Sequence, residues 1–532
     1  MQKKKLTLVI VSLLVVVLSV SLAYFTAQII GKGKDVSVTS ANLQIVFTDS
    51  DGALTETDIE PGWSATKTFT IKNDTKTEYK YNIVIKDLLN TFVTNGYLQY
   101  KITSTNDGYN MTEFKDIPKS SIATDTILAY SVVIPNGVTQ SYTIEFKYAN
   151  DENVDQSDDM GKQLSGTLFI TEGTEEPTLL SQLLADKSTV LTRTDFSKVL
   201  TNDNTNTLYT STEDSKTVYY FAGNATDNWV KFGKYQNDLI IYRGYNTFDE
   251  SKEYSTMDEC TSASSYNINC TGFKYANTGD DIYWRIIRTN SDGSVRLLYH
   301  GISPEATDAV IKKSTSFNEK WNDSMYVGYM YGTSGSLVNN RTNTTDSTIK
   351  TIIDNWYKDN LNTNYGKYLS TTAVYCNDRS TSDNTNFGAH TRLRKNKTPS
   401  YDCAATEDKF TVDTSTGNGK LTYPIALMTA DEVSFAGGRY GTQAPTWYYY
   451  NSANGSSIGN TWWLLSPDAW DGRYAGVFGV NGLSNPGGLD WVNAGSVADV
   501  RPAISLKSCT LYSTGNGSAS DPYTIKETSS GC

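Results

Sequence analysis

The sequence predicts a mainly β protein in two parts, an antiparallel β-sandwich followed by an α+β domain. Three observations predict this fold class. The chain has 532 residues, which is too long for one hydrophobic core. Residues 36–172 alternate apolar and polar side chains with the period of two that is typical of strands with one buried face. The two clearest helical patterns both lie in the C-terminal half, among further strand patterns.

The composition supports ordered domains with polar surfaces. Hydrophobic residues make up 38% of the chain, charged residues 20% and aromatic residues 12%, with 36 tyrosines. This profile is typical of β-rich globular domains and not of disordered chains. The net charge of −12, with no basic patch evident beyond the first few residues, argues against a nucleic-acid partner.

Residues 1–30 carry a predicted export signal. Lys3–Lys5 precede an apolar run from Leu6 to Ala23, and Ser21-Leu22-Ala23 fits a small-x-small cleavage site. The run also has roughly the 18 to 20 residues that a membrane-spanning helix needs, so an uncleaved anchor stays an alternative. In both cases we expect the mature protein to be extracellular or at the cell surface, with membrane contact only through this segment.

The cysteines predict disulfides. An even number of cysteines in an exported chain favours a disulfide framework. Pairing of sequence neighbours closes three short loops, each worth roughly 2 to 4 kcal/mol. A zinc site is the alternative, but no CxxC motif occurs and the chain has only two histidines. We therefore expect no metal or other cofactor. Six cysteines allow fifteen connectivities, and we favour the sequential one because it closes its loops without cross-threading: Cys260–Cys270, Cys376–Cys403 and Cys509–Cys532.

The sandwich is predicted over residues 31–172. Several strands at this spacing, separated by turn clusters such as Pro135-Asn136-Gly137, predict two packed antiparallel sheets. The clearest strands are Leu43–Phe47, Thr66–Ile71, Tyr81–Ile85, Tyr142–Phe146 and Leu168–Ile170.

This N-terminal half resembles the TasA/camelysin-type exported biofilm-matrix proteins. The resemblance is carried by Ala23-Tyr24-Phe25-Thr26-Ala27, by Pro61-Gly62-Trp63-Ser64 before Phe69–Asn73, and by Gly161–Leu168. It implies a jelly-roll-like sandwich whose signal is removed by a dedicated signal peptidase. It also implies, as an expectation, self-assembly into fibres by strand exchange.

Residues 173–216 are predicted to connect the two domains, with one short helix from Leu179 to Lys187. The second domain is predicted over residues 217–532. Ile282–Arg288 and Val295–Tyr299 alternate on either side of a short loop that contains Asp292-Gly293, which is a strong hairpin signal.

Two helices are predicted in this domain. The first follows an apolar stripe from Ile349 to Leu361, with Asp346 or Ser347 as the N-cap. The second begins with the capping box Thr429–Glu432 and ends at Gly437-Gly438.

The segment from Thr461 to Leu506 has the most distinctive composition of the chain. Its two ends, Trp462–Pro467 and Val500–Leu506, are predicted to be buried strands. The middle combines aromatic, Asn, Asp and Gly residues as antibody paratopes do, which predicts displayed side chains on glycine-rich turns. The alternative is a loop that covers the core, with Trp470 and Trp491 as plugs. The predicted binding residues are Asp468, Trp470, Asp471, Arg473, Tyr474, Phe478, Asn481, Asn485, Asp490, Trp491 and Asn493.

Residues 217–532 resemble the C-type-lectin-like domains of bacterial surface proteins. The resemblance is carried together by Trp284–Ile287, Met428–Glu432 and the frame from Trp463 to Pro502. This region is similar in particular to a class of such domains that includes targets of diversity-generating retroelements. It implies a C-type-lectin-like fold whose C-terminal segment contacts a protein or carbohydrate ligand on a cell surface.

These patterns favour a binding protein over an enzyme. A serine triad would need His300 or His390, and no nucleophile-elbow spacing of glycines occurs. All six cysteines have expected disulfide partners, so no catalytic thiol is predicted. We therefore expect a non-catalytic adhesin of the bacterial cell surface. The alternative is a structural fibre or biofilm-matrix subunit that carries the C-terminal domain as a decoration.

Overall fold

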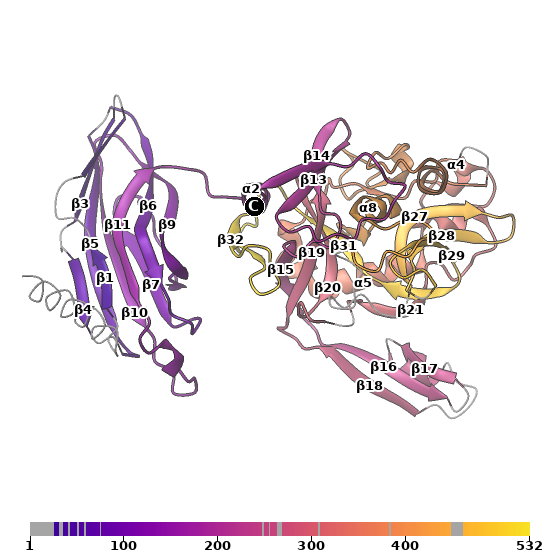
Figure 1. Ribbon diagram of the computed structural model, residues 1–532, viewed down its shortest axis with the longest axis horizontal. Helices are drawn as coiled ribbons and strands as arrows, with labels where there is room; N and C mark the ends of the chain where they lie inside the picture. The colour runs from indigo at the N-terminus through magenta and orange to yellow at the C-terminus, as the bar shows by residue number, and fades with distance from the viewer. Residues whose placement is uncertain are drawn as a thin grey trace, which may run out of the picture. The chain divides into compact units, whose positions relative to one another are not determined.

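The computed structural model describes residues 26–30, 36–40, 43–49, 53–57, 60–74, 76–246, 249–254, 256–262, 269–306, 309–381, 385–447, 461–482 and 484–532. The chain forms two compact units, unit 1 at Met1–Glu176 and unit 2 at Pro177–Cys532 (Figure 1). The fold is mainly β, as predicted. The apolar run Leu6–Ala23 lies outside the described residues, and among the described residues no helix is long and apolar enough to cross a membrane.

Unit 1 is a sandwich of two sheets. One sheet has the order β4 (Ala53–Thr57), β1 (Thr26–Ile30), β11 (Leu164–Glu172), β6 (Tyr79–Asn90), β9 (Ser120–Ile134). The other has the order β2 (Val36–Ser40), β3 (Leu43–Asp49), β5 (Ser64–Asn73), β10 (Thr139–Tyr148), β7 (Leu98–Ser104), β8 (Lys115–Asp116). A short 3₁₀ helix spans Ser157–Asp159. All these strand pairs are antiparallel except β1 with β11, which are parallel.

Alternating side chains build the core of this sandwich. Phe69 and Ile71 on β5 and Ile83 and Ile85 on β6 are fully or almost fully buried in one hydrophobic cluster that both sheets share. Burial of such side chains from two facing sheets is what holds a sandwich together. The predicted sandwich strands are therefore confirmed. Strand β1 also shows that part of the segment predicted as signal belongs to the sheet.

Unit 2 is built around a ten-stranded sheet. Its main path runs β12 (Thr189–Thr192), β13 (Thr207–Glu213), β14 (Lys216–Tyr220), β19 (Asp281–Thr289), β15 (Trp229–Lys234), β33 (Tyr523–Ile525), β32 (Tyr512–Thr514). From β19 the sheet continues through β20 (Val295–Gly301) and β31 (Pro502–Leu506) to β26 (Ile425–Leu427). The predicted hairpin is confirmed, since β19 and β20 pair antiparallel.

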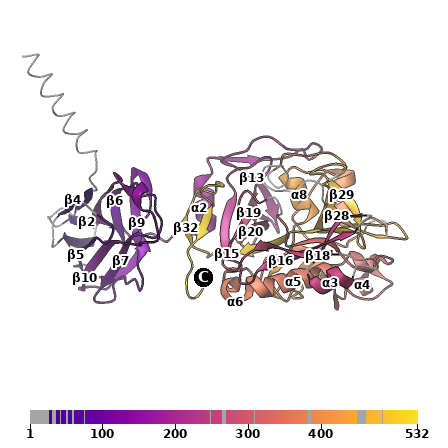
Figure 2. The same ribbon diagram turned by 90° about the horizontal axis from the view of Figure 1, so that it is seen from below.

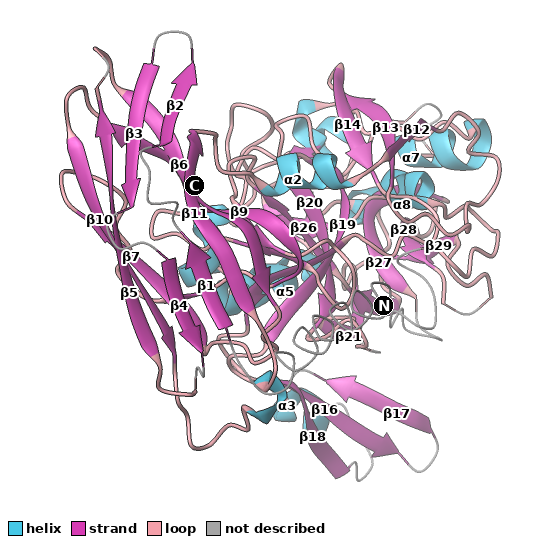
Figure 3. Cartoon of the chain, turned by 60° about the vertical axis from the view of Figure 1, so that its left-hand side comes forward, coloured by secondary structure: helices cyan, strands magenta, loops and turns pink. Residues whose placement is uncertain are grey.

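A second sheet of unit 2 has five strands. Their order is β21 (Lys312–Ser316), β30 (Val497–Val500), β27 (Trp462–Trp470), β28 (Ala475–Val480), β29 (Leu489–Asn493). An arm of β17 (Asp249–Tyr254), β16 (Leu239–Asn246) and β18 (Asn269–Ala276) projects from the unit, as Figures 1 and 3 show. Two-stranded ribbons join β22 (Met330–Tyr331) with β23 (Thr345–Asp346) and β24 (Tyr375–Cys376) with β25 (Lys409–Phe410).

Short helices complete unit 2. Those with α geometry are α2 (Leu179–Asp186), α3 (Met257–Ser262), α4 (Leu337–Asn340), α5 (Thr348–Asn360), α6 (Asn362–Tyr365), α7 (Gly388–His390) and α8 (Ala430–Ala436). The helical turns η2 (Ser324–Val327), η3 (Gly366–Tyr368), η4 (Thr391–Asn396, a π-helix) and η5 (Thr406–Asp408) lie between them. Figure 2 shows α5 and α6 along one side of the sheet that contains β19 and β20.

Both predicted helices have the predicted caps. Ser347 caps α5 by accepting from Lys350 N, and Thr429 and Glu432 form the capping box of α8. Helix α8 ends at Gly437, whose φ of 130° suits glycine. These termini were predictable because capping depends on a few adjacent residues.

The segment predicted as a connector is largely part of unit 2. Only residues up to Glu176 fall outside it. Strands β12 and β13 pair with each other and β13 pairs with β14, which places Thr189–Thr192 and Thr207–Glu213 in the large sheet. The predicted connector was too long because threonine-rich sequence was interpreted as a linker, whereas β-branched residues favour strands.

Two of the three predicted disulfides are present. Cys260 bonds to Cys270 and Cys376 bonds to Cys403. The predicted bond between Cys509 and Cys532 is absent, and both residues are exposed thiols. Burial, and then the neighbouring Cys509 side chain, raises the pKa of the Cys532 thiol to about 11. The pairing prediction identified the neighbours, but they are not covalently linked.

Candidate functional site

The predicted binding residues lie on the five-stranded sheet. The two predicted buried ends are confirmed: Trp462–Pro467 lies in β27, and Val500–Leu506 comprises the last residue of β30 and strand β31 of the ten-stranded sheet. The middle differs from the prediction, because most of it forms β28 and β29 instead of glycine-rich turns. The glycines of β28, Gly476 and Gly479, sit inside a strand, where glycine often marks a close approach of another group.

Three of the eleven predicted residues are buried, so the prediction that they are displayed is wrong. Asp468 is fully buried, and contacts with His390 and Arg394 compensate the burial of its carboxylate. Phe478 is fully buried in the hydrophobic core of unit 2. Asn481 is 6% exposed and donates to Asp490 and Ser484.

The other predicted residues reach the surface to different degrees. Asp471 and Arg473 are exposed. The remaining six are partly exposed: Trp470, Tyr474, Asn485, Asp490, Trp491 and Asn493. The paratope-like surface is therefore smaller than predicted and lies at the β27–β28 turn and on β29.

The β27–β28 turn is held by its own polar groups. The Asp471 carboxylate accepts from the backbone N–H groups of Arg473 and Tyr474 at 2.8 and 2.6 Å. Gly472 has a φ of 88°, which a glycine adopts without strain. The Arg473 guanidinium lies 4.8 Å from the centre of the Tyr474 ring. The turn therefore presents a cation and an aromatic ring in a fixed arrangement.

Three aromatic side chains share one face of the sheet, and we call Tyr440, Phe478 and Trp491 the aromatic shelf. Phe478 and Trp491 are directly opposed in the antiparallel pair of β28 and β29, so both point to the same face. Tyr440 bridges to Leu489 beside β29, and its ring packs edge-on against Phe478 with centroids 6.2 Å apart. Phe478 is the buried floor, while Tyr440 and Trp491 are partly exposed.

The Trp491 indole lies directly on Gly476. A β-carbon built at Gly476 would be 1.6 Å from the indole Nε1, so no other residue could occupy this position without moving the ring. An indole packed against a strand keeps a rigid apolar surface at low entropic cost. This is a geometry suited to stacking against a planar or ring-shaped ligand.

A charged group that sequence reasoning missed lies at the Tyr440 end of the shelf. The Arg394 guanidinium stacks on the Tyr440 ring at 3.8 Å from its centre. Its Nη1 donates to Asp468 Oδ2 at 3.2 Å, and His390 Nδ1 lies 2.6 Å from Asp468 Oδ1. Asp468 thus positions both side chains of the segment that contains α7 and η4.

Two further cations lie near Arg394. The ammonium of Lys397 donates to the backbone carbonyls of Leu393 and Arg394. Burial lowers the pKa of Lys397, and the positive charges of Arg439 and Arg394 lower it further. Arg439 directly precedes Tyr440 in the sequence. Arg394, Lys397 and Arg439 therefore form a basic group next to Tyr440, at one end of the aromatic shelf.

The sequence signal for this basic group is the run Arg392-Leu393-Arg394-Lys395-Asn396-Lys397. The overall charge of −12 does not reveal this run, because the net charge averages a local basic cluster with the acidic residues of the whole chain. The sequence does not show that Arg439 and Tyr440 join this basic group, because their position depends on backbone pairing with Leu489.

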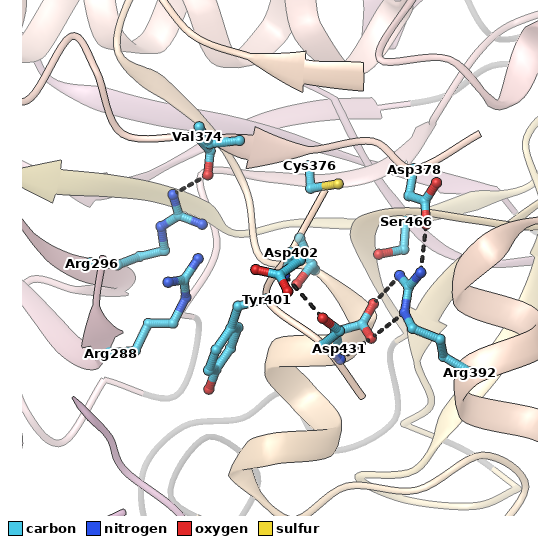
Figure 4. A pocket seen from close by; sticks show the side chains of 12 residues that line it. Arg288, Arg296, Val374, Cys376, Asp378, Arg392, Tyr401, Asp402, Asp431 and Ser466 are labelled. Carbon is cyan, nitrogen blue, oxygen red and sulfur yellow. Dashed lines mark hydrogen bonds and ion pairs between the residues drawn. The ribbon is translucent and has the colours of Figure 1, made fainter. Parts of the chain in front are cut away.

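A second polar region surrounds the N-terminus of α8 (Figure 4). There Arg392 binds both carboxylate oxygens of Asp431 at 2.9 and 2.8 Å, and Asp378 at 2.6 Å. Arg296 donates to the carbonyl oxygen of Val374 and to Glu432, and Arg288 donates to Glu432 as well. Because these arginines are already paired, this pocket is a structural network of unit 2.

No protein-family model matches the chain, and no curated protein is significantly similar to it. The assignment of function therefore depends on the geometry of the site.

Proposed function

We propose that this chain is an exported bacterial cell-surface protein that binds a ligand through unit 2. In this proposal unit 2 is a lectin-like, non-catalytic adhesin domain, and the ligand is a carbohydrate or protein on another surface. The disulfides Cys260–Cys270 and Cys376–Cys403 support exposure to an oxidising compartment, where such bonds persist.

One observation carries the proposal: the partly exposed Trp491 indole rests on Gly476 within the β28–β29 pair. Large aromatic side chains that are fixed by packing but still reach solvent are typical of binding hot spots. The turn between β27 and β28 adds Tyr474 and Arg473 at one end of β28.

The pair of His390 and Asp468 also invites comparison with a catalytic triad. In such triads the histidine Nε2 is hydrogen-bonded to a nucleophile. Within the described part of the chain, no hydroxyl or thiol is hydrogen-bonded to His390, whose polar contacts are to Asp468 and Arg394. The pair therefore supports a positioning role for Asp468 more than a catalytic one.

A fibre or matrix subunit is the second candidate, and one feature of unit 1 favours it. Strand β9 lies at the edge of its sheet and spans Ser120–Ile134. Ile122 on this strand is 75% exposed, and an exposed edge strand can pair with another chain. Spontaneous fibres of the full chain in the electron microscope, lost in an Ile122→Lys variant, would support this second function.

The binding proposal can be tested with the full chain on a glycan array and on fixed epithelial and bacterial cells. We expect binding to at least one surface. Trp491→Ala and Tyr474→Ala should each weaken it by about tenfold, the effect of losing one hot-spot contact. A matched control is Tyr283→Ala, which removes a partly exposed tyrosine from β19 in the other sheet. Unchanged affinity in both Trp491→Ala and Tyr474→Ala would refute the proposed site.

A further inference from the structure

We propose that the ligand of the aromatic shelf is an acidic saccharide, with its carboxylate held by Arg394, Lys397 and Arg439 and a sugar ring stacked on Trp491. This inference rests on the proposed function and names its ligand class. It is carried by the geometry of the basic group, the balance of nearby charges and the support of the indole.

The Arg394 guanidinium is prepared to bind an anion. Its face is fixed against Tyr440 and its Nη1 against Asp468, while the side chain stays 29% exposed. In the described residues no acceptor is hydrogen-bonded to its Nε or Nη2. A planar guanidinium with free N–H groups matches the two oxygens of a carboxylate.

Arg439 carries a hydrogen-bond donor that is not satisfied. Its Nε is buried, and no described residue accepts a hydrogen bond from it. A buried donor without a partner costs free energy, which a ligand acceptor recovers only when the side chain turns to expose that donor. Its charge acts on Lys397, whose lowered pKa reflects burial and then the nearby Arg439 and Arg394.

The negative charges that face this group do not neutralise it. Asp468 is shared between Arg394 and His390 and is fully buried. After burial, the charges of Asp468 and Asp490 raise the pKa of Tyr440. The Asp490 carboxylate already accepts hydrogen bonds from Asn481 Nδ2 at 2.7 Å and from the Trp491 backbone N–H. Three cations therefore stand against two carboxylates that already have partners, in a chain whose net charge is −12.

The cations and the indole belong to one series of neighbouring side chains, and a small anion cannot contact both ends of that series. Arg394, Tyr440, Phe478 and Trp491 form a continuous series of contacts and strand neighbours on one face. A ligand that uses both ends must present an anionic group and a ring face that packs on an aromatic plane. Uronic and sialic residues within an oligosaccharide carry both groups.

The test uses the full chain and two pairs of probes, trigalacturonate with its methyl ester and sialyllactose with lactose. We expect at least one acidic probe to bind about tenfold or more tightly than its neutral counterpart, because charge-assisted hydrogen bonds are lost in the latter. Added salt should reduce this preference. Arg394→Gln and Arg439→Gln should each weaken acidic binding by about tenfold, while Lys420→Gln, which removes one exposed cation elsewhere, should not.

The comparison of ligands needs no mutation, so a variant that fails to fold cannot obscure the result. If neutral probes bind as well as acidic ones and Trp491→Ala weakens both, the acidic-ligand inference is overturned and the proposed function stands. If no acidic probe binds, the inference is also overturned. If the affinity for the probes that do bind is also unchanged in Trp491→Ala, the proposed function fails together with the acidic-ligand inference.

Discussion

Replacing Glu432 with alanine is expected to lower the free energy of unfolding of unit 2 by about 3–5 kcal/mol, the cost of breaking a buried ion pair. Glu432 is 1% exposed, and its Oε1 accepts from Arg288 and Arg296, both at 2.8 Å. Its Oε2 accepts from the backbone N–H of Thr429 at the start of α8. Removal of the carboxylate leaves two buried guanidinium groups short of a partner and one helix cap broken.

Chemical denaturation followed by tryptophan fluorescence measures this loss. Glu407→Ala is the control, because Glu407 is an exposed carboxylate of the same unit and its removal should change the unfolding free energy by less than about 0.5 kcal/mol. A loss below about 1 kcal/mol in Glu432→Ala would mean that the buried network contributes little.

The same residue gives the stability of unit 2 an acid limit. Burial alone would raise the pKa of Glu432, but the charges of Arg296 and Arg288 outweigh it and hold the pKa below its ordinary value. A carboxylate with a depressed folded-state pKa contributes stability that is complete above its unfolded pKa, about 4.3, and is lost as the pH falls through the folded value. As the pH is lowered below about 4, the free energy of unfolding should therefore fall less in the isosteric Glu432→Gln variant than in the native protein.

Gly476→Ala is expected to weaken ligand binding by about tenfold, the same loss as in Trp491→Ala, without removing any aromatic group. The new methyl group would lie 1.6 Å from Trp491 Nε1, so the indole must leave its place on the shelf. The backbone at Gly476 is an ordinary strand, so alanine adds no conformational strain there.

Gly479→Ala is the matched control for that variant. Gly479 lies on the same strand three residues away and therefore on the opposite face, where its β-carbon would be 2.9 to 3.1 Å from Thr461, Val492 and Trp462. We expect a comparable stability change but binding within about twofold of the native value. Equal loss of binding in the two variants would show that strand packing, and not the position of the indole, determines affinity.

Local signals explain which parts of the fold were predictable. The termini of α5 and α8 follow from caps a few residues long, and the β19–β20 hairpin follows from Asp292-Gly293 between alternating strands. The sandwich strands follow from alternation that buries one face. Strands β12 and β13 were missed because their polar, threonine-rich sequence has no apolar periodicity strong enough to distinguish it from a linker.

The site was only half predictable for a different reason. Trp491 and Tyr474 were identified from composition, but Gly476 and Gly479 were interpreted as turn residues. In the structure Gly476 makes room for the indole within a strand. Asp468 was predicted to be exposed because its partner His390 lies 78 residues away in the sequence. Long-range partners of this kind leave no local pattern.

The central claim is that a ligand covers Trp491 and Tyr440, and hydroxyl-radical footprinting of the full chain with and without the best-bound probe tests it most directly. Ligand should protect both side chains from oxidation and leave Tyr283 on β19 unchanged. Unaltered oxidation of Trp491 and Tyr440 at saturating ligand, or protection confined to another part of the chain, would contradict the account.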